Sequence, residues 1–452
     1  MKKIYLLYLL LLPFTASAQF ITAGDGSTYT IQTLSYMEDT GIMCFEREEG
    51  QPPVYLLSKS ITIGDGDRFV MDDGVVVQFD NDVVLTIKGE ADFALTNGST
   101  FDSAFDCDML GAAIVIKSPA ATTFKNCHFS YVGLEMMGEG GASVRDCSFE
   151  YHDGSTAAAL YFVTAGAESL VEDCYFECCA KAAIGSAANA SQPLTIRNCT
   201  FVRNSAANGN VPQINITAAN PLTIEDCTVT GNPDNNMVGG IGISNFMSYD
   251  ANILISGCTV EDNRYGIGLV GPAEKIFIEN CTLRNNKYET NPMNGGSGVS
   301  LYDPYLQTHA YLAGNHIEGN LWGVTVIGCQ NVSLGNVVMN SLYDRGGNVF
   351  QDNGNGGVPY DLYNNSANTV YAQNNTWSVS QQTEEMIETV IYHKHDDPSL
   401  GEVIYWPAAT ETGILQPSTL TPSPYYDLQG RQLDAVPEHG IYIRNGKKII
   451  RR

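Results

Sequence analysis

Aromatic and basic side chains recur at matching positions along one stretch of the chain. Tyr265, Tyr288 and Trp322 each stand five residues past the end of a short apolar segment, and Arg264 and Lys287 directly precede the two tyrosines. Aromatic rings stack on the C–H faces of sugars, and cations pair with carboxylate or sulfate groups. If the three segments stack, these five side chains form a stripe suited to binding a carbohydrate. Ordinary packing at a bend is the alternative, because aromatic ladders also stabilise stacked strands.

Other groupings that could carry chemistry are weaker. Asp72 and Asp73 form an acidic pair followed by a glycine, which is typical of a solvated turn. The segment 393–397, His-Lys-His-Asp-Asp, has the residue types of a metal site, but it precedes a proline, and such a cluster usually forms a turn. No Ser/His/Asp or Cys/His grouping can be recognised. We therefore expect no metal and no cofactor, and we name no catalytic residue.

A repeated motif sets the elements that would position these residues. Eleven times the chain has an apolar residue, a spacer, one of Asn, Asp or Gly, then Cys or Asn, a spacer and another apolar residue. Clear copies occupy 124–129, 144–149, 171–176, 196–201, 224–229, 255–260 and 278–283, a fainter copy opens the series at 104–109, and copies with Asn in place of Cys follow at 312–317, 345–350 and 372–377. Repeats of short strands with a period of roughly 20–50 residues indicate a stacked architecture.

Each motif predicts a bend between two short strands. In the copy at 196–201, Ile196, Cys199 and Phe201 all face inward only if the chain turns at Asn198. Asn, Asp and Gly tolerate the left-handed conformation that such a corner requires. A second corner is expected at Asn204, Asn232, Asn263, Asn286, Asn320 and Asn353, and a third strand at 240–244, 266–270, 298–302 and 323–327. Three strands and three corners per coil give a parallel stack with rungs about 4.8 Å apart.

The pattern resembles the right-handed parallel β-helix proteins of the pectin-lyase-like type over residues 54–380. The resemblance implies an all-β solenoid with end caps and, in many members, an activity on polysaccharides. The Gly-His-Gly and Arg-Ile-Lys elements of the pectin hydrolases of this fold are absent. Three functions stay open: binding of a glycan or another surface partner without catalysis, cleavage of a polysaccharide by a lyase or glycoside hydrolase with an unrecognised site, and a structural surface spacer. We favour the first, because no catalytic grouping is found.

Eight cysteines fall at one inward position of the repeat. They are Cys107, Cys127, Cys147, Cys174, Cys199, Cys227, Cys258 and Cys281. Cys packs well as a small buried apolar residue, and later copies of the motif replace it by Asn. We therefore expect a stack of free thiols, although exported proteins often contain disulfides.

The two ends of a β-helix need covers, because an open end exposes unpaired strand edges. Residues 19–53, which contain strand-like pieces, are expected to cover the N-terminal end. At the other end we expect a cap over 381–407 that contains a short helix at 382–392 with Thr383 as its N-cap.

Both termini carry targeting patterns. Residues 1–18 combine two lysines, an apolar run and an Ala-Ser-Ala site, as in a secretory signal peptide. A Thr/Pro/Ser-rich linker at 408–424 precedes a small β-hairpin tail at 425–452, which resembles the C-terminal sorting signal of type IX secretion cargo of Bacteroidetes. The matching residues are Leu428, Gly430, Arg431, Gly440 and Tyr442. The resemblance implies export to the cell surface or medium, with the outer-membrane secretion machinery as a partner. The alternative is a charged hairpin that carries no targeting signal.

The charge balance excludes two classes of partner. The formal net charge is −26, and no apolar run after the signal peptide is long enough to span a bilayer. Such an acidic chain is a poor ligand for nucleic acid or for an anionic membrane. We therefore expect an exported protein that binds neither.

Overall fold

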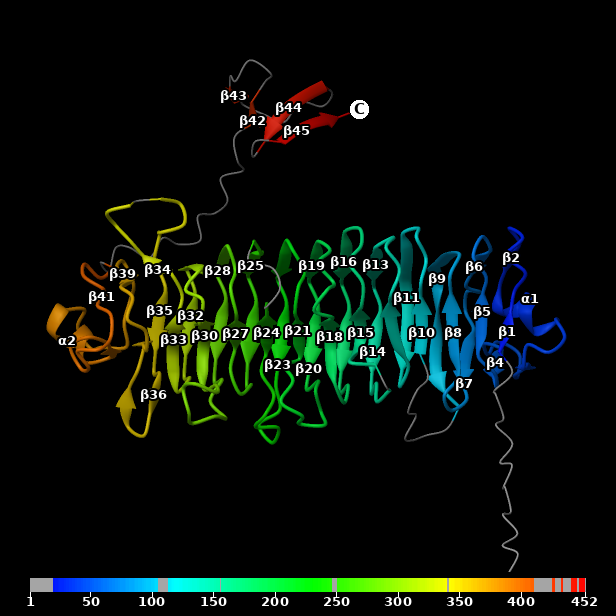
Figure 1. Cartoon of the computed structure of the whole chain (residues 1–452), viewed down its shortest axis with the longest axis horizontal. Helices are drawn as coiled ribbons and strands as arrows, with labels where there is room; N and C mark the ends of the chain where they lie inside the picture. Colours follow the sequence, from blue (N-terminus) through cyan, green and yellow to red (C-terminus); the bar gives the residue numbers. More distant parts are fainter. Residues whose placement is uncertain are drawn as a thin grey trace, which may run out of the picture. The chain divides into compact units, whose positions relative to one another are not determined.

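The structure is a computed structural model that describes residues 19–104, 113–154, 156–245, 250–339 and 341–409 and, beyond them, four strands. The chain divides into two compact units, Met1–Ala408 and Ala409–Arg452. The first unit is a parallel β-helix, in which successive coils add strands to three faces (Figure 1). The motif copy at 104–109, apart from its first residue, lies outside the described residues, and so does Cys107.

One coil shows how the sequence builds the three faces. Its strands are β19 (Leu194–Arg197), β20 (Thr200–Val202) and β21 (Ile214–Ile216), and the next coil repeats them as β22 (Leu222–Glu225), β23 (Thr228–Thr230) and β24 (Ile241–Ser244). All three pairings are parallel and place apolar residues on apolar residues, as with Ile196 and Ile224. Because side chains alternate along a strand, one set from each face fills the bore of the coil.

The first face is a sheet with fourteen strands in the described part of the chain. Besides β21 and β24 it contains β1 (Phe20–Ile21), β5 (Ile61–Ile63), β8 (Val84–Ile87), β10 (Ala113–Ile116), β12 (Gly133–Met136), β15 (Ala158–Phe162), β18 (Ala182–Ser186), β27 (Ile267–Val270), β30 (Ser297–Asp303), β33 (Trp322–Gly328), β38 (Leu362–Asn364) and β40 (Ile391–Tyr392). The four third strands predicted from the sequence are confirmed as β24, β27, β30 and β33.

The other two faces share the long strands β9 (Glu90–Ser103) and β11 (Thr122–Ser130). The second face has β2 (Thr28–Tyr29), β6 (Arg68–Val70), β13 (Ala142–Arg145), β16 (Ser169–Glu172), β19, β22, β25 (Asn252–Ser256), β28 (Lys275–Glu279), β31 (His309–Ala313), β34 (Asn331–Gly335), β39 (Val370–Ala372) and β41 (Val403–Ile404). The third has β3 (Ile42–Phe45), β4 (Val54–Leu57), β7 (Val76–Phe79), β14 (Ser148–Glu150), β17 (Tyr175–Glu177), β20, β23, β26 (Thr259–Glu261), β29 (Thr282–Arg284), β32 (His316–Glu318) and β35 (Val349–Gln351). A small hairpin, β36 (Gly354–Asn355) with β37 (Val358–Pro359), projects from a corner.

The corners predicted inside the motif are confirmed. Ten of the eleven predicted corner residues are described, and each has a left-handed φ between 51° and 76°. They are Asn126, Asp146, Asp173, Asn198, Asp226, Gly257, Asn280, Gly314, Gly347 and Asn374. The eleventh, Asp106, lies outside the described residues.

The second corner was predicted one residue too late. The left-handed residues are Arg203, Asp262, Asn285, Gly319 and Asp352, and the predicted asparagines follow them. Asn204, Asn263, Asn286, Asn320 and Asn353 are buried in the bore instead. In four of them the side-chain oxygen accepts the backbone N–H of the rung before it, as between Asn320 and Asn286 at 2.9 Å. The oxygen of Asn263 accepts a side-chain N–H of Gln213 instead. An amide side chain turned inward supplies one donor and one acceptor per rung, which satisfies the polar backbone of the bend.

We call this column of inward asparagines the asparagine ladder. The sixth predicted asparagine, Asn232, is half-buried, and Gln213 takes its place in the ladder. Its side-chain oxygen accepts the N–H of Asn204 at 2.9 Å, and its nitrogen donates to Asn263 at 2.9 Å. The longer amide side chain of Gln213, which directly precedes β21, therefore bridges the gap.

The bore is filled by columns of like residues. Seven of the eight predicted inward cysteines are described; all are buried, and all are free thiols. The column continues as asparagine, because Asn315 accepts the N–H of Cys281 at 2.9 Å and Asn348 accepts the N–H of Asn315 at 3.1 Å. Phenylalanine rings form a second column with centroid spacings of 4.5–4.9 Å from Phe101 to Phe201. The predicted thiol stack is confirmed for the described cysteines.

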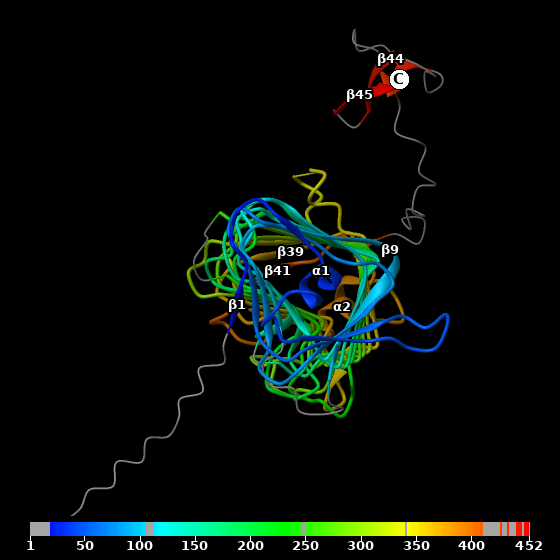
Figure 2. The same cartoon turned by 90° about the vertical axis from the view of Figure 1, so that its right-hand side faces the viewer.

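A short helix covers each end of the bore, as the end-on view in Figure 2 shows. At the N-terminal end, α1 (Ile31–Ser35) buries Ile31 and Leu34, where the sequence suggested strand-like structure. Thr30 caps this helix, and that capping preference outweighs the β-branched composition of the segment. At the C-terminal end, α2 (Glu384–Glu388) begins after its predicted N-cap Thr383 and is shorter than expected. None of the helices in the described residues is long and apolar enough to cross a membrane.

The second unit contains a small antiparallel sheet of β42 (Tyr425–Tyr426), β43 (Gln432–Leu433), β44 (Gly440–Arg444) and β45 (Lys447–Arg451). The predicted hairpin is present, because β44 pairs with β45 with Ile441 opposite Ile450. Of the predicted sorting residues, Gly440 and Tyr442 lie in β44, and Leu428, Gly430 and Arg431 lie outside the described residues.

Candidate functional site

The predicted aromatic stripe does not form one continuous surface. Ser297 pairs with Trp322, and its carbonyl accepts the N–H of Gly266, so Ser297 occupies the place in the coil that was predicted for Tyr288. Tyr288 lies instead in the connection between β29 and β30. The equal sequence offsets failed because the connection is longer in this coil. The path from Leu283 to Val299 has nine residues more than the path between their partners in the preceding coil, Val260 and Ile267. Insertions at corners leave the rungs in register.

Burial also removes two members of the stripe from solvent. Arg264 is 7% exposed, donates to Asn210 and lies 3.5 Å from the Glu289 carboxylate. Trp322 is 4% exposed, and a Cβ at Gly296 would come within 2.8 Å of its ring. Both side chains are therefore packed within the corner of the coil.

The remaining members are separated. The Tyr265 ring covers Gly239, Gly242 and Gly268, each of which leaves room for it by lacking a side chain. Burial raises the pKa of Tyr265 to about 12. Lys287 is exposed and Tyr288 half-buried. Tyr265 is half-buried as well, so these three residues are the members of the stripe that keep some exposure to solvent.

The acidic pair near the N-terminal end has a structural role, as expected. Asp72 accepts the N–H of Gln32 at 2.8 Å, next to the start of α1. Asp73 accepts the N–H of Asn97 at 2.8 Å. Both carboxylates therefore hold a corner of the first coils.

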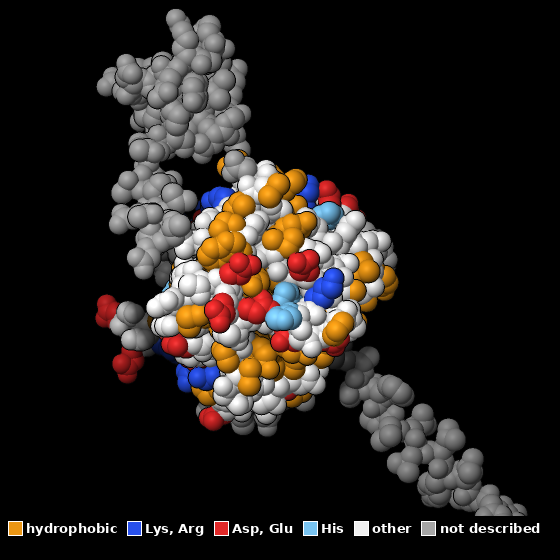
Figure 3. All heavy atoms as spheres, turned by 90° about the vertical axis from the view of Figure 1, so that its left-hand side faces the viewer, with side chains coloured by type: hydrophobic (Ala, Val, Ile, Leu, Met, Phe, Trp, Pro, Cys, Tyr) orange, Lys and Arg blue, Asp and Glu red, His pale blue; other side chains and the backbone are white. Residues whose placement is uncertain are grey.

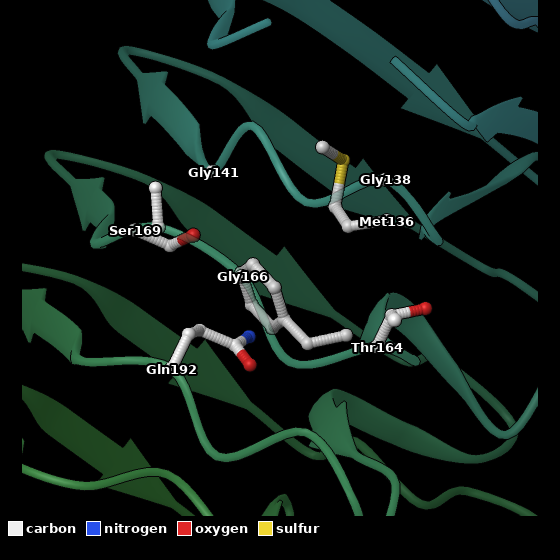
Figure 4. A pocket seen from close by; sticks show the side chains of 9 residues that line it. Met136, Gly138, Gly141, Thr164, Gly166, Ser169 and Gln192 are labelled. Atoms are coloured by element: carbon white, nitrogen blue, oxygen red, sulfur yellow. The ribbon is translucent and has the colours of Figure 1, made fainter. Parts of the chain in front are cut away.

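A small hollow on the side of the coil is too small for a ligand. Met136, Thr164, Ser169 and Gln192 line it, together with several glycines (Figure 4). Its volume is about 10 Å³. A single water molecule needs roughly that much space.

A larger pocket opens at the C-terminal end of the β-helix. Its volume is about 660 Å³, which lies in the usual range for small-molecule sites. We call it the end pocket; it is lined by Glu384, Glu385, Glu388, His393, His395, Glu402, Val403, Ile404, Tyr405 and Trp406. Figure 3 looks onto this end and shows the acidic and histidine side chains gathered on it beside apolar ones.

Two elements bring these residues together. The helix α2 places Glu384 and Glu385 in its first turn and Glu388 one turn later, so that Glu384 and Glu388 share a side of the helix. The last strand, β41, pairs with β39 through Val403 and Val370, which leaves Tyr405 and Trp406 just past the end of the sheet. The segment between them turns at 393–397.

A partly buried hydrogen-bond cluster organises the floor of the end pocket. Glu388 accepts hydrogen bonds from His393 Nε2 at 3.0 Å, from His395 Nδ1 and from the Tyr405 hydroxyl at 2.7 Å. Burial alone would raise the pKa of Glu388, but the hydrogen bonds from Tyr405, His393 and His395 outweigh it and lower that pKa. Burial and the Glu388 carboxylate raise the pKa of Tyr405. Glu388 is therefore an ionised acceptor with three donors around it.

The cluster contains the residue types of a metal site, but the position of the proton on His393 does not suit metal binding. Potential ligand atoms of Glu388, His393 and His395 lie within 4.8 Å of one another. However, His393 Nδ1 accepts the backbone N–H of Val403 at 2.9 Å, so the neutral ring must carry its proton on Nε2. The nitrogen that faces Glu388 then has no free lone pair for a metal. The three residues fit a carboxylate clamp rather than a metal centre.

The two aspartates of the 393–397 segment belong to the turn. Asp396 accepts the N–H of His393 at 3.0 Å, and Asp397 accepts the N–H of Ser399 at 2.9 Å. Hydrogen bonds from Ser399 lower the pKa of Asp397. Both aspartates therefore stabilise the turn that follows β40.

Sequence analysis drew attention to the two histidines but missed the pocket around them. Glu388, Glu402, Tyr405 and Trp406 were not identified as site residues. The available signal was the pair of aromatics directly after the last strand, combined with glutamates one turn apart on the capping helix. That combination could be interpreted only once β41 was known to end beside α2.

Comparison with known proteins agrees with the fold. A family model described as right handed beta helix region matches residues 68–211. The coil is therefore a right-handed parallel β-helix. No curated protein matches the chain.

Among solved structures, the chain is similar to the periplasmic alginate epimerase AlgG. The TM-score is 0.48 with 10% sequence identity, over 84% of this chain and 83% of that chain. Two mutant structures of the same enzyme give TM-scores of 0.49 with the same identity and coverage. Likeness at this identity concerns the fold and says nothing about the chemistry of the present chain.

Proposed function

We propose that this protein is an exported β-helix protein that binds a glycan in the end pocket without cleaving it. The observation that carries the proposal is the position of Trp406. Its side chain is 44% exposed and lines a pocket of about 660 Å³ beside Tyr405 and several carboxylates. An accessible indole next to hydrogen-bond acceptors in a concave site is a typical carbohydrate-binding arrangement.

The chemistry of a sugar fits the side chains that line the end pocket. One face of a pyranose ring presents C–H groups, which pack on an aromatic face, and its rim presents hydroxyl donors. Glu384, Glu385 and Glu402 are exposed at the pocket and offer acceptors for those hydroxyls. Hydrogen bonds to ionised acceptors are shorter and stronger than neutral ones.

The titratable groups on the floor are poorly suited to catalysis. A general acid or base works best with a pKa near the working pH and with a free proton position. The pKa of Glu388 is lowered and that of Tyr405 raised, and both groups are hydrogen-bonded to each other. The Nδ1 of His393 is occupied by a backbone N–H. These groups therefore favour binding over turnover.

Cleavage of a polysaccharide by a lyase or glycoside hydrolase is the second candidate. The meeting of a phenol, a carboxylate and an exposed imidazole, at Tyr405, Glu388 and His395, is the observation that favours it. A structural spacer is the third, and it needs no pocket at all.

One experiment separates the three. The mature protein and its Trp406→Ala variant are tested against a panel of neutral, acidic and amine-bearing polysaccharides for binding and for new reducing or unsaturated ends. We expect at least about a tenfold loss of affinity in the variant and no new ends. Tyr36→Ala, an exposed aromatic at the opposite end, is the matched control. New chain ends would favour the enzyme, and the absence of any binding would favour the spacer.

We also propose that the signal peptide at 1–18 and the tail at 425–452 direct the protein out of the cell. The support is the sequence pattern, including Leu428, Gly430, Arg431, Gly440 and Tyr442. Deletion of the tail should retain the protein in the periplasm, with the outer-membrane secretion machinery as the partner that no longer recognises it. Unchanged surface appearance of the deleted form would reject the sorting role.

A further inference from the structure

We infer that the glycan held in the end pocket carries free amino groups, so that the ligand class is a polymer or oligomer of amino sugars that are not acetylated. This inference rests on the proposed function and names its ligand. Four carboxylates line the pocket, and no Lys or Arg is among the described residues that line it.

Three of these carboxylates have no cation next to them. Glu388 is satisfied by its three donors, but Glu384, Glu385 and Glu402 form no ion pair among the described residues. Some carboxylates on the sides of the coil are paired with arginine. Glu177 lies 2.7 Å from Arg203, and Glu279 lies 3.2 Å from Arg345. The end pocket differs from these paired sites because several unpaired carboxylates line one concave space.

Helix capping does not account for this difference. Glu384 and Glu385 stand in the first turn of α2, where carboxylates are favoured without any ligand. Glu402 is not on a helix; it directly precedes β41 and lines the same pocket. Carboxylates from two separate elements thus converge on one open space that also contains Trp406.

This convergence selects among sugars by charge. Like charges in a shared, partly enclosed space repel one another, and a bound cation relieves that repulsion. An ammonium group over the face of Trp406 also gains a cation–π attraction. A uronic acid or a sulfated sugar is negatively charged and is therefore repelled by the pocket carboxylates. A neutral sugar gains only the stacking and hydroxyl contacts. The amino sugar alone uses every feature of the wall.

The test uses two hexasaccharides with the same ring and linkage, a glucosamine hexamer and an N-acetylglucosamine hexamer, in buffer acidic enough to protonate the amines. Binding to the mature protein is measured by calorimetry at low and high salt. We expect the glucosamine hexamer to bind at least about tenfold more tightly at low salt, with the advantage reduced at high salt. Glu402→Gln and Glu385→Gln should each weaken binding of the glucosamine hexamer by a larger factor than binding of the acetylated hexamer, which loses only the stronger hydroxyl contacts of an ionised acceptor. Glu48→Gln, an exposed glutamate at the other end, is the control.

The outcomes distinguish this inference from the function on which it rests. Equal affinity for the two hexamers, or tighter binding of an oligogalacturonate, overturns the amine inference and leaves glycan binding standing. Failure to bind any glycan of the panel overturns both. A lysine hexapeptide that binds while neither sugar does also overturns both, and would assign the pocket to basic peptides.

Discussion

His393 and Glu388 lie 3.0 Å apart, Nε2 to Oε1, while the other nitrogen of the same imidazole accepts the N–H of Val403. One ring therefore joins the capping helix α2 to the last strand β41. The contact is almost wholly buried on the histidine side, where the side chain is 7% exposed. It closes the C-terminal end of the coil and shapes the floor of the end pocket.

Removing the carboxylate should destabilise this cap. In Glu388→Ala the buried His393 Nε2–H loses its acceptor, and we expect a loss of about 1–3 kcal/mol in the free energy of unfolding. Because the pKa of Glu388 is lowered in the folded protein, its contribution is present above the ordinary value of 4.5 and disappears as the pH falls below that value. Denaturant titrations of the wild type and variant across this range should therefore converge in acid. Glu385→Ala, exposed on the same helix, is the control. A constant difference at all pH values would contradict the clamp.

The cap also illustrates what sequence analysis can and cannot supply. The left-handed corners, such as Asn198 and Asp226, follow from local backbone sterics, and the buried thiols follow from an alternation that repeats in every coil. Both were predicted correctly because each depends only on its own rung. The stripe at Tyr265, Tyr288 and Trp322 depended on how the connection before β30 is accommodated, which the motif does not specify.

The end pocket was even more difficult to predict from the sequence. Its walls come from α2, from the turn at 393–397 and from the residues after β41, and these meet only because β41 adds to the sheet beside β39. Nothing in the repeat encodes that pairing, since the motif ends at Trp377. The second corner was predicted one residue too late for a simpler reason. The left-handed residue and the inward asparagine are neighbours in the sequence, and asparagine suits both positions.

The asparagine ladder provides a direct test of that correction. Asn286 is fully buried; its side chain donates to Val260 at 3.0 Å and accepts from Asn263 at 3.1 Å. Asn286→Ala leaves these backbone groups unpaired, and we expect it to cost about 2–4 kcal/mol in the free energy of unfolding. Its neighbour Asn285 has φ 56°, so Asn285→Gly should change stability by less than about 1 kcal/mol. The reverse order of the two effects, in thermal or denaturant unfolding, would restore Asn286 as the corner.

The burial of His152, in the N-terminal half of the coil, should make the free energy of unfolding depend on pH. It is fully buried, its Nδ1 has no partner among the described residues, and burial together with Lys181 lowers its pKa from 6.5 to about 4. Between these two values the unfolded chain binds a proton that the folded protein does not, so stability falls as the pH drops from 6.5 toward 4. The full effect is about 3 kcal/mol.

His152→Asn should remove this acid sensitivity. Position 152 follows the left-handed Tyr151, as each ladder asparagine follows a left-handed residue, so the backbone there accommodates an inward amide side chain. We expect the melting temperatures of the variant at pH 6.5 and at about pH 4.5 to lie closer together than those of the wild type. His128→Asn, an exposed histidine in the same region, should leave the difference unchanged. An equally acid-sensitive His152→Asn variant would assign the effect to other groups.

Thiol accessibility tests the interior of the whole stack. Nine described cysteines are buried and free, whereas Cys44 is exposed and Cys178 is partly exposed. With Cys44, Cys178 and Cys107 replaced by serine, we expect no reaction with a thiol-specific reagent in the native protein and nine reactive thiols after denaturation. A buried thiol is protected both by exclusion of the reagent and by the cost of forming a thiolate away from water, so reaction should require unfolding of the coil. Fewer than nine thiols in denaturant would mean that neighbouring rungs are joined by disulfides, and rapid native labelling would mean that the column faces solvent. Either result would contradict the packing on which the fold depends.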